Sequence, residues 1–142
     1  MKILQVLTGK SWGGGSVVVH AVTRALIARG DEVWVAVVDD ANAKPFEALG
    51  AHIVRPPLWF RALQPLDVVP FIALYRLCRR ERFDLVVAHT SKGGFIGRIA
   101  ARLAGVPHII YHEHAFYFNQ LKPGPVRTFF LALERWRPKR AI

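Results

Sequence analysis

The sequence predicts an α/β protein built on a parallel β-sheet with helices on both faces. Short aliphatic runs at residues 2–7, 32–38 and 84–88 are typical of strands that are buried on both sides. Segments with helical periodicity or helix-ending signals separate these runs. Repeated strand–helix units of this length favour parallel strands joined by right-handed crossovers. Sheets of this kind bind ligands at the edge where strands end and helices begin.

The first half of the chain reads as three strands separated by two helical segments. A strand over 2–7 precedes a helix that runs from Val18 to the stop signal Gly30. A second strand covers 32–38, a helical turn covers 46–49 and a third strand covers 52–54. The apolar stripe of the first helix consists of Val18, Ala21, Val22, Ala25 and Leu26.

The second half continues the alternation. A helix follows Pro70, a strand covers 84–88, a helix over 93–104 stops at Gly105, and a fifth strand begins at 108. Two segments break the pattern. Residues 55–71 form a proline-punctuated connection, and residues 126–136 form an apolar helical face among basic residues, which suits either a core or an anionic membrane. The connection carries the apolar side chains Leu58, Trp59, Phe60 and Leu63.

Composition limits the classes of protein and partner. A chain of 142 residues is one domain's worth, and its single cysteine suits a reducing compartment. Without a signal peptide or a run of about 20 apolar residues, a cytoplasmic location is expected. Residues 1–54 balance five basic against five acidic side chains, so the net charge of +10 arises from residues 55–142. Such asymmetry favours an anionic partner, either a phosphorylated substrate or an acidic membrane surface. The alternative is a solvated basic surface that has no specific partner. Nucleic acid is disfavoured because no aromatic-rich recognition motif accompanies the charges.

The stretch 8-TGKSWGGGSVV-18 predicts a phosphate-binding turn. Gly13, Gly14 and Gly15 let backbone approach a ligand, and Ser16 is expected to cap a helix whose first N–H groups attract anions. A P-loop is excluded because Leu4 stands where its first glycine is required. A dinucleotide fingerprint would lack its third glycine. A nucleotide-binding oxidoreductase nevertheless remains an alternative, because Asp39 or Asp40 could bind a ribose. The other alternative is a strand-to-helix turn that binds no ligand.

Histidines at two strand ends indicate chemistry on the same edge. His89 closes the fourth strand and is followed by Thr90, Ser91 and Lys92, whereas the sequence His112-Glu113-His114 closes the fifth. Alternate residues share a face of a strand, so the two histidines of the second group point together. A histidine there can donate to a phosphate or a sugar hydroxyl, or it can be a buried residue without a ligand. A metal site formed with His108 is a weaker alternative, because the spacing matches no zinc motif.

The motifs together resemble family 4 glycosyltransferases of the GT-B fold. The glycine turn and 20-HAVTRALIARGDEV-33 are similar to the family's opening, a double glycine followed by a helix and "L-x-x-R-G-H-x-V". The run 83-FDLVVAHTSKGGFIGRIAARLAGVPHIIYHEHAF-116 is similar to the family's second pattern, which ends in "H-G-F". Here Ala115 stands in place of that glycine, and Asp31 stands in place of the common histidine. The resemblance covers nearly the whole chain and implies a Rossmann-like N-terminal half of a GT-B fold.

The resemblance also implies roles. Gly13–Gly15 would face the donor diphosphate, and His114 would contact the transferred sugar. His89, Thr90, Ser91, Lys92 and Glu113 would form the rim near a glycan or lipid-linked acceptor, and Lys92 would also help to stabilise the diphosphate. The substrate would be a nucleotide-sugar, with no cofactor and no metal required. The implied activity is retaining sugar transfer in envelope or exopolysaccharide synthesis, at the inner face of the plasma membrane if the protein is peripheral.

One part of the family pattern does not occur in these residues. Family members carry a second domain with two glutamates spaced E-x7-E, and none of the glutamates here has a glutamate eight residues further on. We therefore expect residues 1–142 to be a single, truncated acceptor-side domain that lacks the donor-binding domain. A partner would then supply that half. A non-catalytic subunit that binds the acceptor or a membrane is the alternative function.

Overall fold

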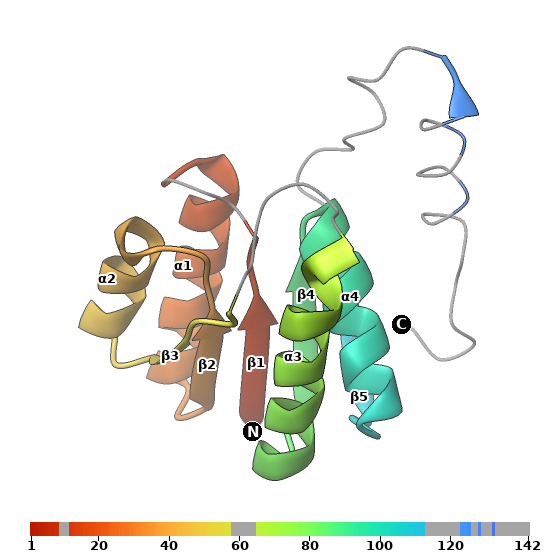
Figure 1. Ribbon diagram of the computed structural model, residues 1–142. Helices are drawn as coiled ribbons and strands as arrows, with labels where there is room; N and C mark the ends of the chain where they lie inside the picture. Colours follow the sequence, from red (N-terminus) through yellow and green to blue (C-terminus); the bar gives the residue numbers. More distant parts are fainter. Residues whose placement is uncertain (9–11, 58–64, 113–122, 126–127, 129–131, 133–142) are drawn as a thin grey trace.

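The computed structural model describes residues 1–8, 12–57, 65–112, 123–125, 128 and 132 of the chain. Its described core is an α/β unit of strands alternating with helices (Figure 1). The strands are β1 (Lys2–Val6), β2 (Glu32–Ala36), β3 (His52–Val54), β4 (Leu85–His89) and β5 (His108–His112). The helices are α1 (Gly14–Ala28), α2 (Asp40–Ala48), the 3-10 helix η1 (Pro65–Asp67), α3 (Val68–Glu81) and α4 (Ser91–Leu103).

All neighbouring strands of the sheet pair in parallel, in the order β3-β2-β1-β4-β5. The predicted α/β class and parallel sheet are therefore confirmed. The chain builds outward from β1 to β3 and then returns to add β4 on the other side of β1. The order consequently reverses between β1 and β4, where a doubly wound sheet opens a crevice at its carboxyl edge.

Helices cover both faces of the sheet, as predicted. In Figure 1, α1 and α2 lie beside β2 and β3, whereas α3 and α4 lie beside β4 and β5. Because side chains alternate along a strand, β1 contributes Leu4 and Val6 to the core under α3 and α4, and the next residue, Leu7, to the core under α1 and α2. The sheet is thus buried between two apolar cores, which explains the aliphatic character of its strands.

Helix α1 differs from the prediction in two respects. It begins at Gly14, four residues earlier than expected, and its N-cap is Gly13, so the prediction that Ser16 caps the helix is wrong. Ser16 instead lies buried in the first turn and donates from Oγ to Asn42 Oδ1 at 2.8 Å. The predicted stripe does not face the sheet either, because Val18 and Val22 are each 41% exposed. The buried side chains of α1 are Ser16, Val19 and Thr23.

The helix ends follow the sequence signals more closely than the helix starts. Gly30 and Gly105 follow α1 and α4 with φ of 92° and 82°, the left-handed backbone that glycine adopts without strain, which confirms the two predicted stops. Helix α2 is longer than the predicted turn over 46–49. Asp39 caps it by accepting from the Asn42 N–H at 3.0 Å, and the helix continues through Pro45.

A close approach of α4 to the sheet depends on glycine. A Cβ at Gly94 would lie 2.1 Å from the Tyr111 ring of β5, closer than any real contact. The bare backbone lets the ring pass beneath the helix, where the Arg98 guanidinium stacks over it at 4.1 Å and donates from Nε to the Gly94 carbonyl. The glycines that open this helix in the sequence therefore set how α4 packs on the sheet. The apolar segments 58–63 and 126–136 fall largely outside the described residues.

Candidate functional site at the carboxyl edge of the sheet

The segments predicted to form the site meet at one edge of the sheet. Gly13–Gly15 follow the carboxyl end of β1, and His89 is the last residue of β4, which pairs directly with β1. His112 is the last residue of β5 and lies opposite His89 in the register of those strands. The glycine turn and the end of β5 therefore share an edge, as predicted. His114 and Glu113 lie outside the described residues, so their roles stay predictions.

The glycine turn is open on its outer side. Gly13 has an extended backbone, with φ of −142° and ψ of −176°, and Gly14 opens α1. A Cβ at either position would meet no atom within 4 Å, and neither has a positive φ. The fold of the described residues thus gives no reason for glycine at these two positions. An open turn of this kind is expected where a ligand must approach the backbone N–H groups at the start of a helix.

Thr90 has a strained backbone at the start of α4. Its φ of 66° and ψ of 161° lie in a region that is almost exclusive to glycine, and a β-branched side chain makes that conformation costlier. Its carbonyl accepts from the Gly94 N–H at 2.6 Å, and its hydroxyl is hydrogen-bonded to that of Thr8, which follows β1. The first contact lies within the first turn of α4, and the second joins the carboxyl ends of β1 and β4. Strain of about 1–3 kcal/mol is a feature that often accompanies binding sites.

Lys92 lies in an ion pair that the sequence did not predict. Its Nζ donates to Asp67 Oδ1 at 2.5 Å, and the two side chains are only 5% and 12% exposed. Asp67 ends η1, so the pair fastens the end of the 55–67 connection to the first turn of α4. A ligand diphosphate would have to compete with this carboxylate for the ammonium group. The predicted contact between Lys92 and a diphosphate stays a prediction. Ser91 opens the same helix.

His89 is buried at 2% exposure and belongs to a chain of polar groups. Its Nε2 lies 3.1 Å from Gln5 Oε1, and Gln5 Nε2 donates to Thr23 Oγ1 at 2.6 Å. On its other side, the His89 ring lies 5.6 Å from the ring of His112, which is exposed. His89 therefore connects the interior of the α1 face to the exposed edge of β5.

Two of the three histidines of the weaker metal alternative lie far apart, and the third, His114, lies outside the described residues. His108 and His112 occupy opposite ends of the five-residue strand β5, about 13 Å apart at the rise of an extended chain. Asp39 and Asp40, the candidates for a ribose-binding acid, have local partners. Asp39 caps α2, and Asp40 Oδ1 accepts from Arg55 Nη2 at 2.9 Å.

Sequence reasoning missed two polar residues that lead to His89. Gln5 lies within the run predicted as an aliphatic strand, and Thr23 is not among the residues of the predicted apolar stripe. A signal did exist for Gln5, because an amide inside KILQVL must find partners when its strand is buried on both faces. The contact between Asp67 and Lys92 spans 25 residues, and nothing local in the sequence announces it.

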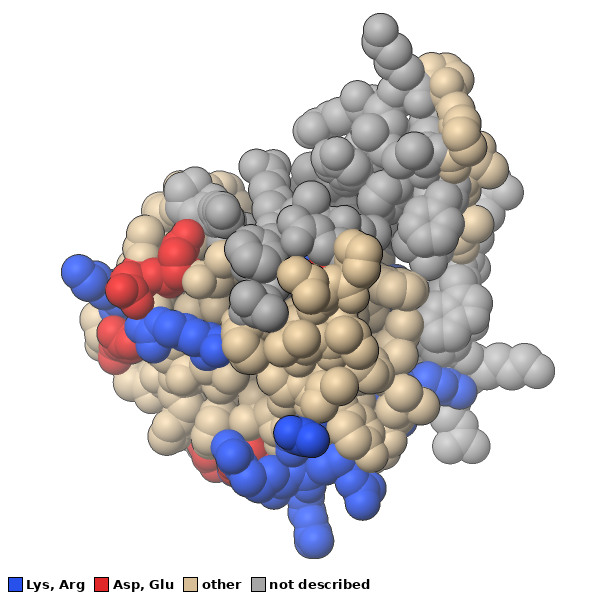
Figure 2. Space-filling model, in the orientation of Figure 1, with Lys and Arg blue, Asp and Glu red and all other residues tan. Residues whose placement is uncertain are grey.

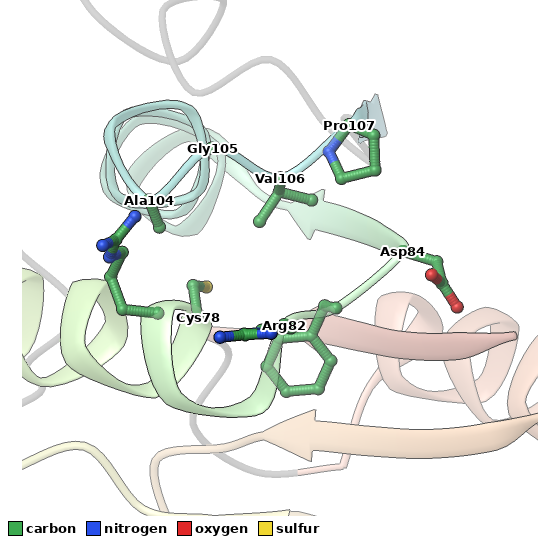
Figure 3. A pocket seen from close by; sticks show the side chains of 9 residues that line it. Cys78, Arg82, Asp84, Ala104, Gly105, Val106 and Pro107 are labelled. Carbon is green, nitrogen blue, oxygen red and sulfur yellow. The ribbon is translucent and has the colours of Figure 1, made fainter.

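A separate pocket of about 450 Å³ lies at the opposite, amino edge of the sheet (Figure 3). It is lined by the end of α3, the start of β4 and the link from α4 to β5, and includes Arg82, Asp84 and Pro107. The Cys78 sulfur lies in its wall, and burial raises the pKa of that thiol to about 12. Lys and Arg side chains gather at the lower end of the molecule in Figure 2, where α3 ends. This pocket is far from the residues discussed above.

The strand order and the shared edge define the class of the fold, a Rossmann-like domain in which ligand binding is expected at the carboxyl ends of β1 and β4. The sequence model of Glycosyltransferase Family 4 matches residues 12–141. The chain therefore belongs to glycosyltransferase family 4, and its sheet is the Rossmann-like half seen in GT-B structures.

One curated relative and two solved structures are similar to this chain. The chain is 42% identical over 73 residues to the Escherichia coli UDP-Gal:α-D-GlcNAc-diphosphoundecaprenol α-1,3-galactosyltransferase, a match that covers 51% of this chain and 19% of the relative. Anabaena HepE, solved with UDP and glucose, shares 20% identity with a TM-score of 0.65 over 86% of this chain and 32% of its own. Neisseria meningitidis UDP-GlcNAc 2-epimerase, solved with UDP-GlcNAc, has 15% identity and a TM-score of 0.64, and the match covers 96% and 39% of the two chains.

The last two likenesses concern the fold alone. The chain spans about a third of those structures and about a fifth of the galactosyltransferase. Within the residues that the structure describes, no helix has both the length and the apolar character required to cross a bilayer.

Proposed function

We propose that this chain forms the acceptor-side domain of a retaining glycosyltransferase that moves a sugar from a nucleotide-sugar to a glycan or lipid-linked acceptor. The family match over residues 12–141 carries the proposal. The acceptor class is supported by the relative that shares 42% identity, whose name specifies a diphosphoundecaprenol-linked sugar. Bacterial envelope or exopolysaccharide synthesis is the context in which such acceptors are used. A second domain, in the same polypeptide or in a partner, would bind the nucleotide.

In this proposal Gly13–Gly15 bind the diphosphate of the donor. The open space beside Gly13 and Gly14 supports it, since an oxyanion could approach the backbone there without displacing a side chain. Amide N–H groups at the start of α1 and the positive end of the helix dipole would stabilise charge as the leaving group departs. Fixed backbone donors can supply this stabilisation without a metal ion or cofactor, so we propose that neither is required.

The remaining rim residues would hold the sugar and the acceptor. His114 follows His112 by two residues, so an extended chain would bring it to the same edge as the glycine turn, where it would hydrogen-bond and orient the transferred sugar. His89, Thr90, Ser91 and Glu113 would border the acceptor. Lys92 would neutralise diphosphate charge only by exchanging Asp67 for the ligand, which makes the ion pair a switchable contact in this scheme.

Peripheral association with an anionic membrane at the cytoplasmic face would bring the enzyme to a lipid-linked acceptor. Helix α1 supports this part of the proposal, because its outer face is apolar and its sequence contains no acidic residue. Val17 is 51% exposed, and Val18 and Val22 are each 41% exposed. Trp12, 40% exposed at the start of the helix, is a residue type that favours membrane interfaces. The excess of basic residues after position 54 would add attraction to anionic lipid.

The test is a sugar-transfer assay on the intact enzyme that contains this chain. A panel of nucleotide-sugars is offered with diphosphoundecaprenol-linked acceptors, and product is followed by mass spectrometry. His114→Ala is expected to lower kcat by about a hundredfold or more, the usual size of a lost contact that acts in the transition state. His108→Ala is the matched control, an exposed histidine at the far end of β5, and should leave turnover unchanged.

The outcome separates the proposal from its alternatives. Transfer with the wild type and loss in His114→Ala supports it, whereas equal activity in both variants overturns the role of His114. Binding of acceptor or vesicles without turnover for any donor would indicate a non-catalytic subunit. A fluorescence response to a nicotinamide cofactor, together with none to a nucleotide-sugar, would indicate an oxidoreductase.

A further inference from the structure

A continuous line of buried polar groups runs from α1 to the candidate site. Thr23 and Gln5 are fully buried, and His89 is 2% exposed. Thr23 Oγ1 donates to the Val19 carbonyl at 2.8 Å, and Gln5 Nε2 donates to Thr23 Oγ1 at 2.6 Å. Gln5 Oε1 then lies 3.1 Å from His89 Nε2. The line crosses from α1 through β1 to the last residue of β4.

The donor and the acceptor of each hydrogen bond in this line follow from the hydroxyl group of Thr23. A threonine hydroxyl has one proton, and that of Thr23 is already donated to a backbone carbonyl. Gln5 must therefore donate to Thr23, which fixes the amide with its Nε2 toward α1 and its Oε1 toward His89. Because an amide oxygen only accepts, His89 Nε2 must carry the proton.

We propose that Thr23 and Gln5 are positioning residues that hold His89 as the Nε2–H tautomer. In that tautomer the neutral ring carries its lone pair on Nδ1, which is then the ring's hydrogen-bond acceptor. Thr23 and Gln5 are both uncharged side chains, so this line fixes the tautomer and the orientation of the ring through neutral hydrogen bonds. The tautomer is inferred from the contacts of Thr23, Gln5 and His89 described above, and its use at the acceptor rim rests on the proposed function.

The tautomer can be read directly by long-range ¹H–¹⁵N NMR on the ¹⁵N-labelled chain, at a pH where His89 is neutral. The wild type is expected to show a protonated Nε2 and an unprotonated Nδ1 at His89. A protonated Nδ1 in the wild type would overturn the proposal without recourse to any variant.

Thr23→Val tests whether the line, and not the ring's own preference, sets the tautomer. Valine matches threonine in shape but removes the acceptor of the Gln5 amide, so the amide can rotate and present its N–H₂ group to His89. We expect the Nδ1–H form to become populated. Thr23→Ser restores the hydroxyl and should restore the wild-type spectrum. Ser16→Ala is the matched control, a buried hydroxyl on the same helix that bonds Asn42 instead. A Thr23→Val spectrum identical to that of the wild type would overturn the positioning role.

Kinetics of the intact enzyme test the use of the tautomer separately. Thr23→Val should lower kcat at least about tenfold, which is a modest part of what proton transfer by a positioned side chain contributes. The variant should also change the pH–rate profile, while KM is nearly constant. Thr23→Ser should recover both. A switched tautomer with unchanged kcat and pH profile would overturn the catalytic use of His89. Lack of turnover in the wild type with every donor would count against the proposed function and leave the NMR result intact.

Discussion

Two glycines at helix starts, Gly14 in α1 and Gly94 in α4, have opposite relations to their surroundings. A Cβ at Gly94 would collide with the ring of Tyr111, whereas a Cβ at Gly14 would meet nothing within 4 Å. Packing within the described chain therefore requires glycine at position 94. No packing reason of this kind exists at position 14, which directs attention to a ligand at the turn.

Gly14→Ala is expected to change stability and activity in opposite directions. Alanine favours helix over glycine by up to about 1 kcal/mol, so the midpoint of urea unfolding should stay or rise. The added methyl group would obstruct approach to the backbone, so the KM for the nucleotide-sugar in the intact enzyme should increase. Gly94→Ala is the comparison, because overpacking costs about 1–3 kcal/mol and should lower the unfolding midpoint. Unchanged kinetics in Gly14→Ala would contradict a diphosphate site at the turn.

The types of residue in the sequence predicted some features of the candidate site but not others. The strand-end histidines and the glycine turn could be assigned to one edge, because parallel strands all end on the same side. The Lys92–Asp67 pair and the strained Thr90 could not, since the first joins residues 25 apart and the second depends on backbone angles. For His114, the prediction reaches beyond the described residues.

Among the elements, strands were predictable because a sheet buried on both faces requires aliphatic runs. Strand β3 matches its prediction at both ends, and the others differ by a few residues. Helix α1 was harder, because apolar side chains occur nearly all round it and its period does not select a face. The sheet-facing side carries Ser16 and Thr23, whose hydroxyls bond Asn42 and take part in the Gln5 line. Specific hydrogen bonds, which no hydropathy pattern encodes, decide that orientation.

Helix α2 was underestimated for a related reason. Pro45 lies in the interior of the helix, where proline removes one backbone donor. The N-terminal cap at Asp39 and the burial of Phe46 offset that loss. A cap and an anchoring aromatic therefore extend the helix across a residue that usually limits one.

The outer face of α1 provides a prediction at the scale of an element. The double variant Val18→Asp, Val22→Asp should reduce cosedimentation with phosphatidylglycerol vesicles several-fold, because it places two negative charges on an exposed apolar face. Circular dichroism should show an unchanged fold, since neither side chain is buried. Leu103→Asp is the control, an apolar residue 61% exposed at the end of α4. Equal vesicle binding by the double variant and the wild type would rule out α1 as the membrane-facing surface.

At the scale of the whole molecule, the two edges of the sheet have different chemistry. The described residues of the carboxyl edge include hydroxyl, imidazole and glycine groups and the Lys92–Asp67 ion pair, whereas the amino edge holds the ion pairs of Lys2 beside a pocket. Lys2 Nζ, at the start of β1, contacts Glu81 Oε2 at 2.8 Å and Glu32 Oε1 at 3.3 Å. These contacts fasten the first strand to the end of α3 and to β2. We therefore expect the ion pairs of Lys2 and the proposed binding site to lie at opposite ends of the same strands.

The amino edge gives a pH dependence with a defined sign. Hydrogen bonds from Lys2 and then Arg80 hold the pKa of Glu81 below its ordinary value of 4.5. A lowered pKa means that this contribution to stability is present above pH 4.5 and is lost as the pH falls through the folded-state value. Glu81→Gln should therefore flatten the dependence of the unfolding free energy on pH between about 5 and 3, measured by urea titration. Parallel curves for the variant and the wild type would show that the pair contributes no pH-dependent stability.

The position of Cys78 gives the chain a built-in reporter. The sequence holds one cysteine, and its thiol is 3% exposed beneath the ends of α3 and α4, with burial holding it protonated at neutral pH. A maleimide would consequently react slowly with the native chain and rapidly once those helices separate from the sheet. The rate of alkylation would report that opening without an engineered cysteine, at the edge of the sheet opposite the proposed site of sugar transfer.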